Sequence, residues 1–198
     1  MFLLVTGASG VGKSTVRQRL AASLPPNVEA VELATLGETP QWSLEWRHRM
    51  VERLVQRAHA LEEDGRHLLV CGDPIPPGEV VSAPSGEGLA LHVLLLHAEP
   101  DAQLTRLKAR GDAAEYFDRH VAFADWMRRH VEDPYYRPDV VIQDGWEEMR
   151  WERWVERASA PDASPPWSSH VLDTSVLDAE SVAREVSTWV EQTLARGD

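Results

Sequence analysis

One combination of short segments at the start of the chain constrains its fold more than any other feature. Residues 2–6 (FLLVT) form a continuous apolar run, typical of a strand buried on both faces of a parallel sheet. The next eight residues match the pattern G-x-x-x-x-G-K-[ST] at every specified position. Val16, Leu20 and Leu24 then recur at helical spacing. A strand, a glycine loop and a helix in this order predict an α/β fold with parallel strands.

The glycine loop has the composition that a phosphate site requires. Glycines allow successive backbone N–H groups to curl around phosphate oxygens, and the following helix N-terminus favours negative charge. In this pattern Lys13 bridges the β- and γ-phosphates, and Ser14 binds Mg²⁺. The chain has only two lysines, Lys13 and Lys108, so a chance glycine turn would match with a probability of about one in a thousand. The residues predicted to bind ATP are Gly7, Ala8, Ser9, Gly10, Val11, Gly12, Lys13, Ser14 and Thr15.

Composition narrows the class of protein further. Twenty Lys and Arg residues against 32 Asp and Glu give a net charge of −12 with histidine neutral, which repels a nucleic-acid backbone. Apolar residues make up 43% of the chain, and no apolar run approaches the roughly 18 residues of a membrane span. The one cysteine, Cys71, excludes an internal disulfide framework. We expect one domain over residues 1–198, located in the cytoplasm and without a membrane partner.

Strand and helix patterns alternate along the rest of the chain. Further strands are predicted at 28–33, 67–71, 91–96 and 170–173, and helices at 44–61, 101–110, 115–131 and 182–194. A Pro/Gly/Ser-rich loop is predicted at 74–88. Prolines interrupt residues 133–169, where Trp146, Trp151 and Trp154 suggest one short amphipathic helix and 140–142 is compatible with a further strand. We interpret residues 111–168 as a lid followed by a Pro/Trp-rich insertion.

With this order of elements, the chain resembles the P-loop kinases of the adenylate, shikimate and gluconate kinase type. The resemblance is specific at Gly7 to Ser14. It is supported by Arg106-Leu107-Lys108-Ala109-Arg110, which looks like the R-x-x-x-R element that opens the lid in such kinases, and by Leu172-Asp173-Thr174-Ser175, which looks like their adenine-side loop. The resemblance implies a three-layer fold with five parallel strands in the order 2-3-1-4-5. It also implies that Arg106, Arg110 and Thr174 bind the nucleotide, with Arg110 against the adenine.

The resemblance implies a role for arginines in the lid as well. Arg119, Arg128 and Arg129 would close over the phosphates, and we assign Arg128 a catalytic role because a closing arginine neutralises charge on the migrating group. The alternative is that each of these arginines is a solvated helix charge paired with a neighbouring acid.

Two carboxylates follow predicted strands, at the sheet edge where parallel α/β proteins bind ligands. The resemblance implies that Asp73 helps to hold Mg²⁺ and that Glu32 or Asp73 orients the phosphoryl acceptor. The family motif near Glu32 usually reads D-x-D, whereas this chain has Glu32-Leu33-Ala34, so the identity of the acceptor base stays open. The alternatives are an exposed strand-end carboxylate for Glu32 and a turn cap for Asp73.

Aromatic residues and histidines give weaker indications. Trp42 and Trp46 lie where the resembling kinases cover their acceptor, but their spacing also fits a staple at the start of a helix. The eight histidines show no zinc-binding spacing, and we expect surface positions for His120 and His130. Cys71 is expected to be a core residue.

These patterns favour ATP- and Mg²⁺-dependent transfer of a phosphoryl group to a small-molecule acceptor. The main alternative is a nucleotide-binding switch without an acceptor. A GTPase is disfavoured because the chain has neither an [NT]-K-x-D run nor a D-x-x-G run after the strand at 67–71. A polynucleotide end kinase is disfavoured by the net charge, although Arg47, Arg49, Arg53 and Arg57 could form a local basic patch.

Overall fold

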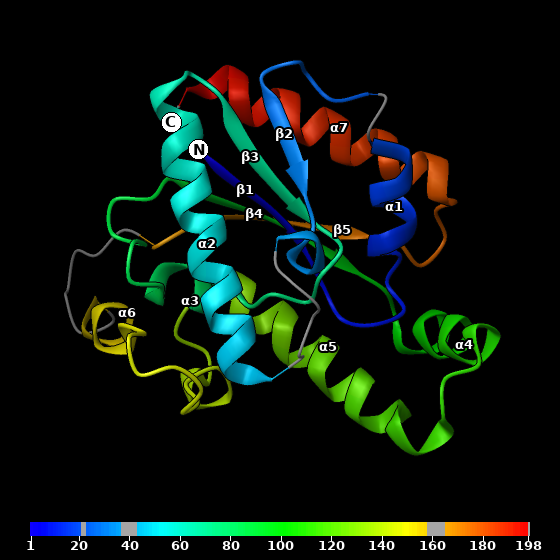
Figure 1. Cartoon of the computed structure of the whole chain (residues 1–198). Helices are drawn as coiled ribbons and strands as arrows, with labels where there is room; N and C mark the ends of the chain where they lie inside the picture. Colours follow the sequence, from blue (N-terminus) through cyan, green and yellow to red (C-terminus); the bar gives the residue numbers. More distant parts are fainter. Residues whose placement is uncertain (21–22, 37–42, 158–164, 198) are drawn as a thin grey trace.

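A five-stranded parallel sheet lies at the centre of the protein (Figure 1). The computed structural model describes residues 1–20, 23–36, 43–157 and 165–197. The strands are β1 (Phe2–Thr6), β2 (Val28–Val31), β3 (His67–Cys71), β4 (Leu91–His97) and β5 (Ser168–Asp173). Their order in the sheet is β2-β3-β1-β4-β5, and all four pairings are parallel. The predicted strand order is therefore confirmed.

Helices cover both faces of the sheet and complete three layers. The helices of the described residues are α1 (Lys13–Leu20), α2 (Leu44–Glu63), α3 (Pro77–Ser82), α4 (Pro100–Arg110), α5 (Phe117–Glu132), α6 (Trp151–Arg157) and α7 (Ala179–Arg196). Helices α1 and α7 pack on one face, whereas α2, α3, α5 and α6 pack on the other (Figure 1). Among these helices, none combines the length and the apolar character needed to cross a membrane.

The central strand explains why the sheet is covered on both sides. Every residue of β1 is buried, as the continuous apolar run predicts. Because side chains alternate along a strand, Phe2 and Leu4 join the core beneath α2, while Leu3 and Val5 join the core beneath α1 and α7. Both faces therefore bury apolar surface.

The structure corrects one predicted loop and resolves one open alternative. Residues 77–82 of the predicted 74–88 loop form the helix α3, which begins with Pro77. Proline is well tolerated at a first helical position because the N–H it lacks has no partner within the helix. Residues 140–142 do not form a strand; a 3-10 turn over Pro138–Val140 occupies the start of this segment.

The prediction that His130 lies on the surface is wrong. Its ring is fully buried and stacks on Trp126 with ring centroids 4.8 Å apart. Trp154 from α6 and Trp167 each lie with their centroids 5.3 Å from the same ring. This burial lowers the pKa of His130 to about 4. Sequence spacing did not reveal the burial because the two covering indoles come from segments more than 20 residues away.

An ion pair with a buried carboxylate joins α2 to α3. The Glu79 carboxylate is fully buried, and Arg47 donates to it from the first turns of α2. Burial raises the pKa of Glu79 to about 7, although the guanidinium opposes this shift. The pair joins the helix after β3 to the helix after β2, and both strands end at the same edge of the sheet.

We predict that Arg47→Met lowers the free energy of unfolding by about 3 kcal/mol, since it leaves a buried carboxylate without its cation. The loss should be larger at pH 8 than at pH 6, because Glu79 without its partner folds in the protonated form. Denaturant titrations at the two pH values measure both effects. Arg184→Met removes an exposed helical ion pair with Glu180 and should cost less than about 0.5 kcal/mol. Equal losses in the two variants would contradict the prediction.

Candidate functional site

The glycine loop between β1 and α1 is held tightly against the neighbouring strand. Gly7 has φ +147°, and a Cβ atom built on it would lie 2.4 Å from the carbonyl oxygen of Leu96 in β4. Only glycine allows so close an approach at this backbone conformation. The loop is thus fixed beyond the end of β1, and α1 begins directly after it at Lys13.

Lys13 bends back over the loop. Its ammonium group donates to the carbonyl oxygen of Ala8 at 2.8 Å, and only 7% of the residue is exposed. Burial lowers the pKa of Lys13 to about 8, with the nearby Asp73 carboxylate opposing the shift and Arg110 adding to it. The cation is therefore poorly compensated, and an added anion at the loop would stabilise its charged form.

A cavity of about 500 Å³ opens over the loop. Most of the predicted nucleotide residues line it, namely Ser9, Gly10, Val11, Gly12, Lys13, Ser14, Thr15, Arg106, Arg110 and Thr174. Gly7 and Ala8, the first two residues of the loop, are buried and do not line the cavity. The cavity extends to Leu177, Ala179 and Val182 at the start of α7, which sequence reasoning missed. The apolar positions directly after Asp173-Thr174 were the signal that could have found them.

Arg106 is held in place at the α7 end of the cavity. One terminal nitrogen donates to the Thr174 hydroxyl at 3.0 Å, and the other donates to the Thr174 carbonyl. Thr174 is buried, with its hydroxyl 3.1 Å from the carbonyl oxygen of Val11 and 2.9 Å from that of His97. Thr174 thus joins the glycine loop, β4 and the arginine.

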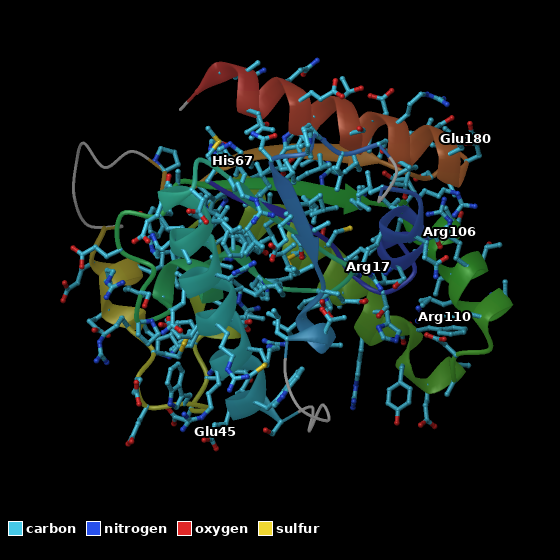
Figure 2. All side chains as sticks on the ribbon, turned by 45° about the horizontal axis from the view of Figure 1, so that its top comes forward. Arg17, Glu45, His67, Arg106, Arg110 and Glu180 are labelled. Atoms are coloured by element: carbon cyan, nitrogen blue, oxygen red, sulfur yellow. The ribbon has the colours of Figure 1, made fainter. Side chains whose placement is uncertain are left out.

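The other predicted arginines have different surroundings. Arg110 lines the cavity and forms a bidentate pair with Asp112, with Nε 2.7 Å from Oδ1. Figure 2 shows Arg17, Arg106 and Arg110 on the side of the molecule where α1 lies, away from Glu45 and His67. The structure does not bring the arginines of α5 to the cavity. Arg128 is 3.7 Å from Glu132, Arg129 is 3.1 Å from Asp125, and Arg119 lies over the Tyr116 ring.

The two predicted carboxylates meet at the edge of the sheet where β2 and β3 end. Asp73 is buried, and its Oδ2 atom accepts from the Leu33 N–H at 2.7 Å. Burial raises the pKa of Asp73, while the Leu33 hydrogen bond and the Lys13 and Arg17 cations oppose the rise. Glu32 forms an ion pair with Arg17 at 2.7 Å. Two acids and two cations therefore share this edge, next to the cavity.

The geometry also permits a magnesium site. Ser14 is exposed and lines the cavity, and Asp73 is close enough to Lys13 for their charges to interact. Within the described residues, no three His, Cys, Asp or Glu side chains gather into a metal cage. Mg²⁺ does not need one, because it usually binds through one or two protein oxygens together with phosphates and waters. Ser14 and Asp73 fit that mode of binding.

The region just before α2 is described only in part. Trp46 packs against the core. Its backbone N–H donates to the Ser43 hydroxyl, which caps the N-terminus of α2. Trp42 lies outside the described residues, so the two interpretations of the Trp42 and Trp46 pair stay open. Arg47 and Arg57 pair with Glu79 and Glu29, and Arg49 pairs with Glu45.

Comparisons with known proteins establish the fold. No family model matches the chain, and no curated protein matches its sequence. A sugar kinase from Janibacter sp. HTCC2649, solved without ligand, is 16% identical, with 96% of this chain and 94% of that chain covered and a TM-score of 0.55. The tunicamycin resistance protein of Deinococcus radiodurans is 19% identical, with the same coverage and a TM-score of 0.53. APE1195 is 18% identical, covers 97% and 95%, and has a TM-score of 0.53. The chain therefore has the three-layer α/β fold of P-loop kinases.

Proposed function

We propose that this protein is an ATP- and Mg²⁺-dependent phosphotransferase that acts on a small-molecule acceptor. The observation that carries the proposal is the buried Lys13 ammonium at the start of α1, beside a cavity that continues to Thr174 and α7. A cavity of about 500 Å³ is within the range of small-molecule sites. Loop amides, a helix N-terminus and a cation converge at one end, where the triphosphate would bind.

In the proposed reaction an acceptor oxygen attacks the γ-phosphorus and the bond to the β-phosphate oxygen breaks. ADP leaves, and the acceptor proton passes to a carboxylate or to water. Glu32 or Asp73 orients the acceptor, because both lie at the sheet edge beside the loop. Little base strength is required if the transition state is loose. Bound Mg²⁺ would neutralise phosphate charge, with Ser14 and Asp73 as its protein contacts.

Arg106 and Arg110 supply the remaining positive charge. Arg106 is held by Thr174 and lies toward the α7 end of the cavity, whereas Arg110 is close enough to Lys13 to lower the pKa of that lysine. We propose that both contact the nucleotide. A closing role for Arg128, and the division of 111–168 into lid and insertion, stay predictions, as does the cytoplasmic location.

The main alternative is a nucleotide-binding switch without an acceptor. One observation favours it: Glu32, a candidate for orienting the acceptor, is already paired with Arg17 at 2.7 Å. Turnover of ATP that rises on adding one member of a panel of sugars, nucleosides and antibiotics would support the kinase. Tight ATP binding with no stimulated turnover across the panel would support the switch.

A polynucleotide end kinase has less support. Three of the four arginines that could form a basic patch on α2 are paired with glutamates, and Arg53 donates to the Leu36 carbonyl. These pairs reduce the positive charge available to a phosphate backbone. Salt-dependent affinity for oligonucleotides would restore this hypothesis.

We predict that Lys13→Ala abolishes the rise in melting temperature that MgATP gives the unmodified protein. In the unmodified protein, the affinity for MgATP should fall above pH 8, because Lys13 loses its proton near that pH when no anion is bound. The fall should approach about tenfold per pH unit well above the pKa. Calorimetric titrations between pH 7 and 9.5 measure it. Lys108→Ala changes the other lysine and should leave both results unchanged. Stabilisation by MgATP that survives in Lys13→Ala would contradict the assignment of the glycine loop as the ATP site.

We predict that Asp73→Asn raises the Mg²⁺ concentration needed for half-maximal nucleotide binding by about tenfold, since it removes one charged oxygen from the metal. The substitution keeps an oxygen that can accept from the Leu33 N–H, so the fold should be retained. Mg²⁺ titrations at fixed ATP provide the measurement. Asp118→Asn, on the exposed surface of α5, is the control. Superimposable Mg²⁺ titrations for Asp73→Asn and the unmodified protein would exclude Asp73 from the metal site.

A further inference from the structure

A fully buried glutamine lies on the face of α4 that covers the glycine loop. Gln103, Arg106, Leu107 and Arg110 share this face, because positions three, four and seven apart lie together on a helix. The two arginines line the cavity, whereas Gln103 and Leu107 are completely buried. The same face of α4 therefore supplies both the cationic wall of the cavity and a contact to the loop.

The amide nitrogen of Gln103 connects three segments. It donates to the carbonyl oxygen of Ser9 in the loop at 2.8 Å and to that of His120 at 3.3 Å. His120 is in the first turn of α5. One side chain thus bonds the phosphate loop to the helix that follows it by more than 100 residues.

The loop is also pressed against α4. Gly10 has φ +84°, and a Cβ atom built there would lie 3.2 Å from Cγ of Gln103 and 3.1 Å from Cγ of Leu107. A side chain at position 10 would therefore crowd α4, and glycine allows the loop to pack directly against Gln103 and Leu107.

The buried amide is not explained by packing alone. Within the described part of the chain, Oε1 of Gln103 has no hydrogen-bond partner. An unpaired buried acceptor is unfavourable, and an apolar side chain of similar length would fill the same space without it. The two bonds donated by Nε2 account for an amide at this position.

A second set of contacts joins the same elements at the surface. Asp112 pairs with Arg110, and its Oδ2 atom lies 4.0 Å from Nε2 of His120. The first turn of α5 is therefore connected to the loop through Gln103, and it lies near the Asp112–Arg110 pair at the cavity.

We propose that Gln103 is a positioning residue that couples triphosphate binding at the loop to the ordering of α5. The inference rests on the proposed function. The Ser9 carbonyl and the Gly10 N–H belong to one peptide group, so an N–H bonded to a phosphate makes that carbonyl a stronger acceptor. Triphosphate binding at the loop therefore strengthens the hydrogen bond that Gln103 donates to Ser9. The same side-chain amide donates to the His120 carbonyl and so holds the start of α5 in place relative to the loop.

The test measures hydrogen exchange of residues 117–124 with and without the magnesium complex of β,γ-imido-ATP. In the unmodified protein the nucleotide should slow this exchange. Gln103→Met keeps the volume and removes the donor, so the slowing should be lost, while affinity falls about fivefold, as expected for one hydrogen bond. Gln56→Met removes a glutamine that bonds Glu52 within α2, and it should leave the slowing intact.

A second measurement needs no variant. The side-chain amide protons of Gln103, assigned through contacts with Gly10 and Leu107, should shift downfield and exchange more slowly when the nucleotide is added to the unmodified protein. Unchanged amide resonances, or slowing at 117–124 that persists in Gln103→Met, would overturn the coupling while leaving nucleotide binding intact. Absence of any nucleotide binding to the unmodified protein would instead overturn the proposed function, and the coupling with it.

Discussion

The position of the candidate site depends on how closely the glycine loop approaches β4. Gly7 passes so near the Leu96 carbonyl that no side chain fits between them. This contact fixes the path of the chain from β1 into α1, and so fixes where Lys13 begins the helix. A loop held this firmly presents its amides without reorganisation when an anion arrives.

Charge is concentrated at the edge of the sheet next to that loop. Lys13, Arg17, Glu32 and Asp73 come from α1 and from the ends of β2 and β3. Burial lowers the pKa of Lys13 and raises the pKa of Asp73, and the attraction between the two groups opposes both shifts. A buried lysine with a lowered pKa and a buried acid with a raised pKa are typical of functional sites. The pattern suits a ligand that brings both negative charge and a divalent cation, because each would compensate one member of the cluster.

The face of the sheet beneath α2 and α5 has another kind of organisation. His130 lies among the indoles of Trp126, Trp154 and Trp167, and Arg47 of α2 pairs with the buried Glu79 carboxylate of α3. These contacts attach α6 and Trp167 to α5 and join α3 to α2. None of these side chains lines the cavity.

The glycine loop could be predicted from the sequence, because a strand, a G-x-x-x-x-G-K-S loop and a helix are local features set by neighbouring residues. The order of the strands was predicted through the family resemblance. It also indicated Arg106, Arg110 and Thr174 at the cavity. The fold, in contrast, sets which polar groups meet: Arg17 pairs with Glu32, Arg47 pairs with Glu79, and Gln103 donates to the carbonyl oxygens of Ser9 and His120. Those partners are 15 to 94 residues apart, and local patterns do not encode the approach of distant segments. The burial of His130 and the helix at 77–82 had the same origin, since packing against α6 and α2 overrode the local indications of a surface residue and a loop.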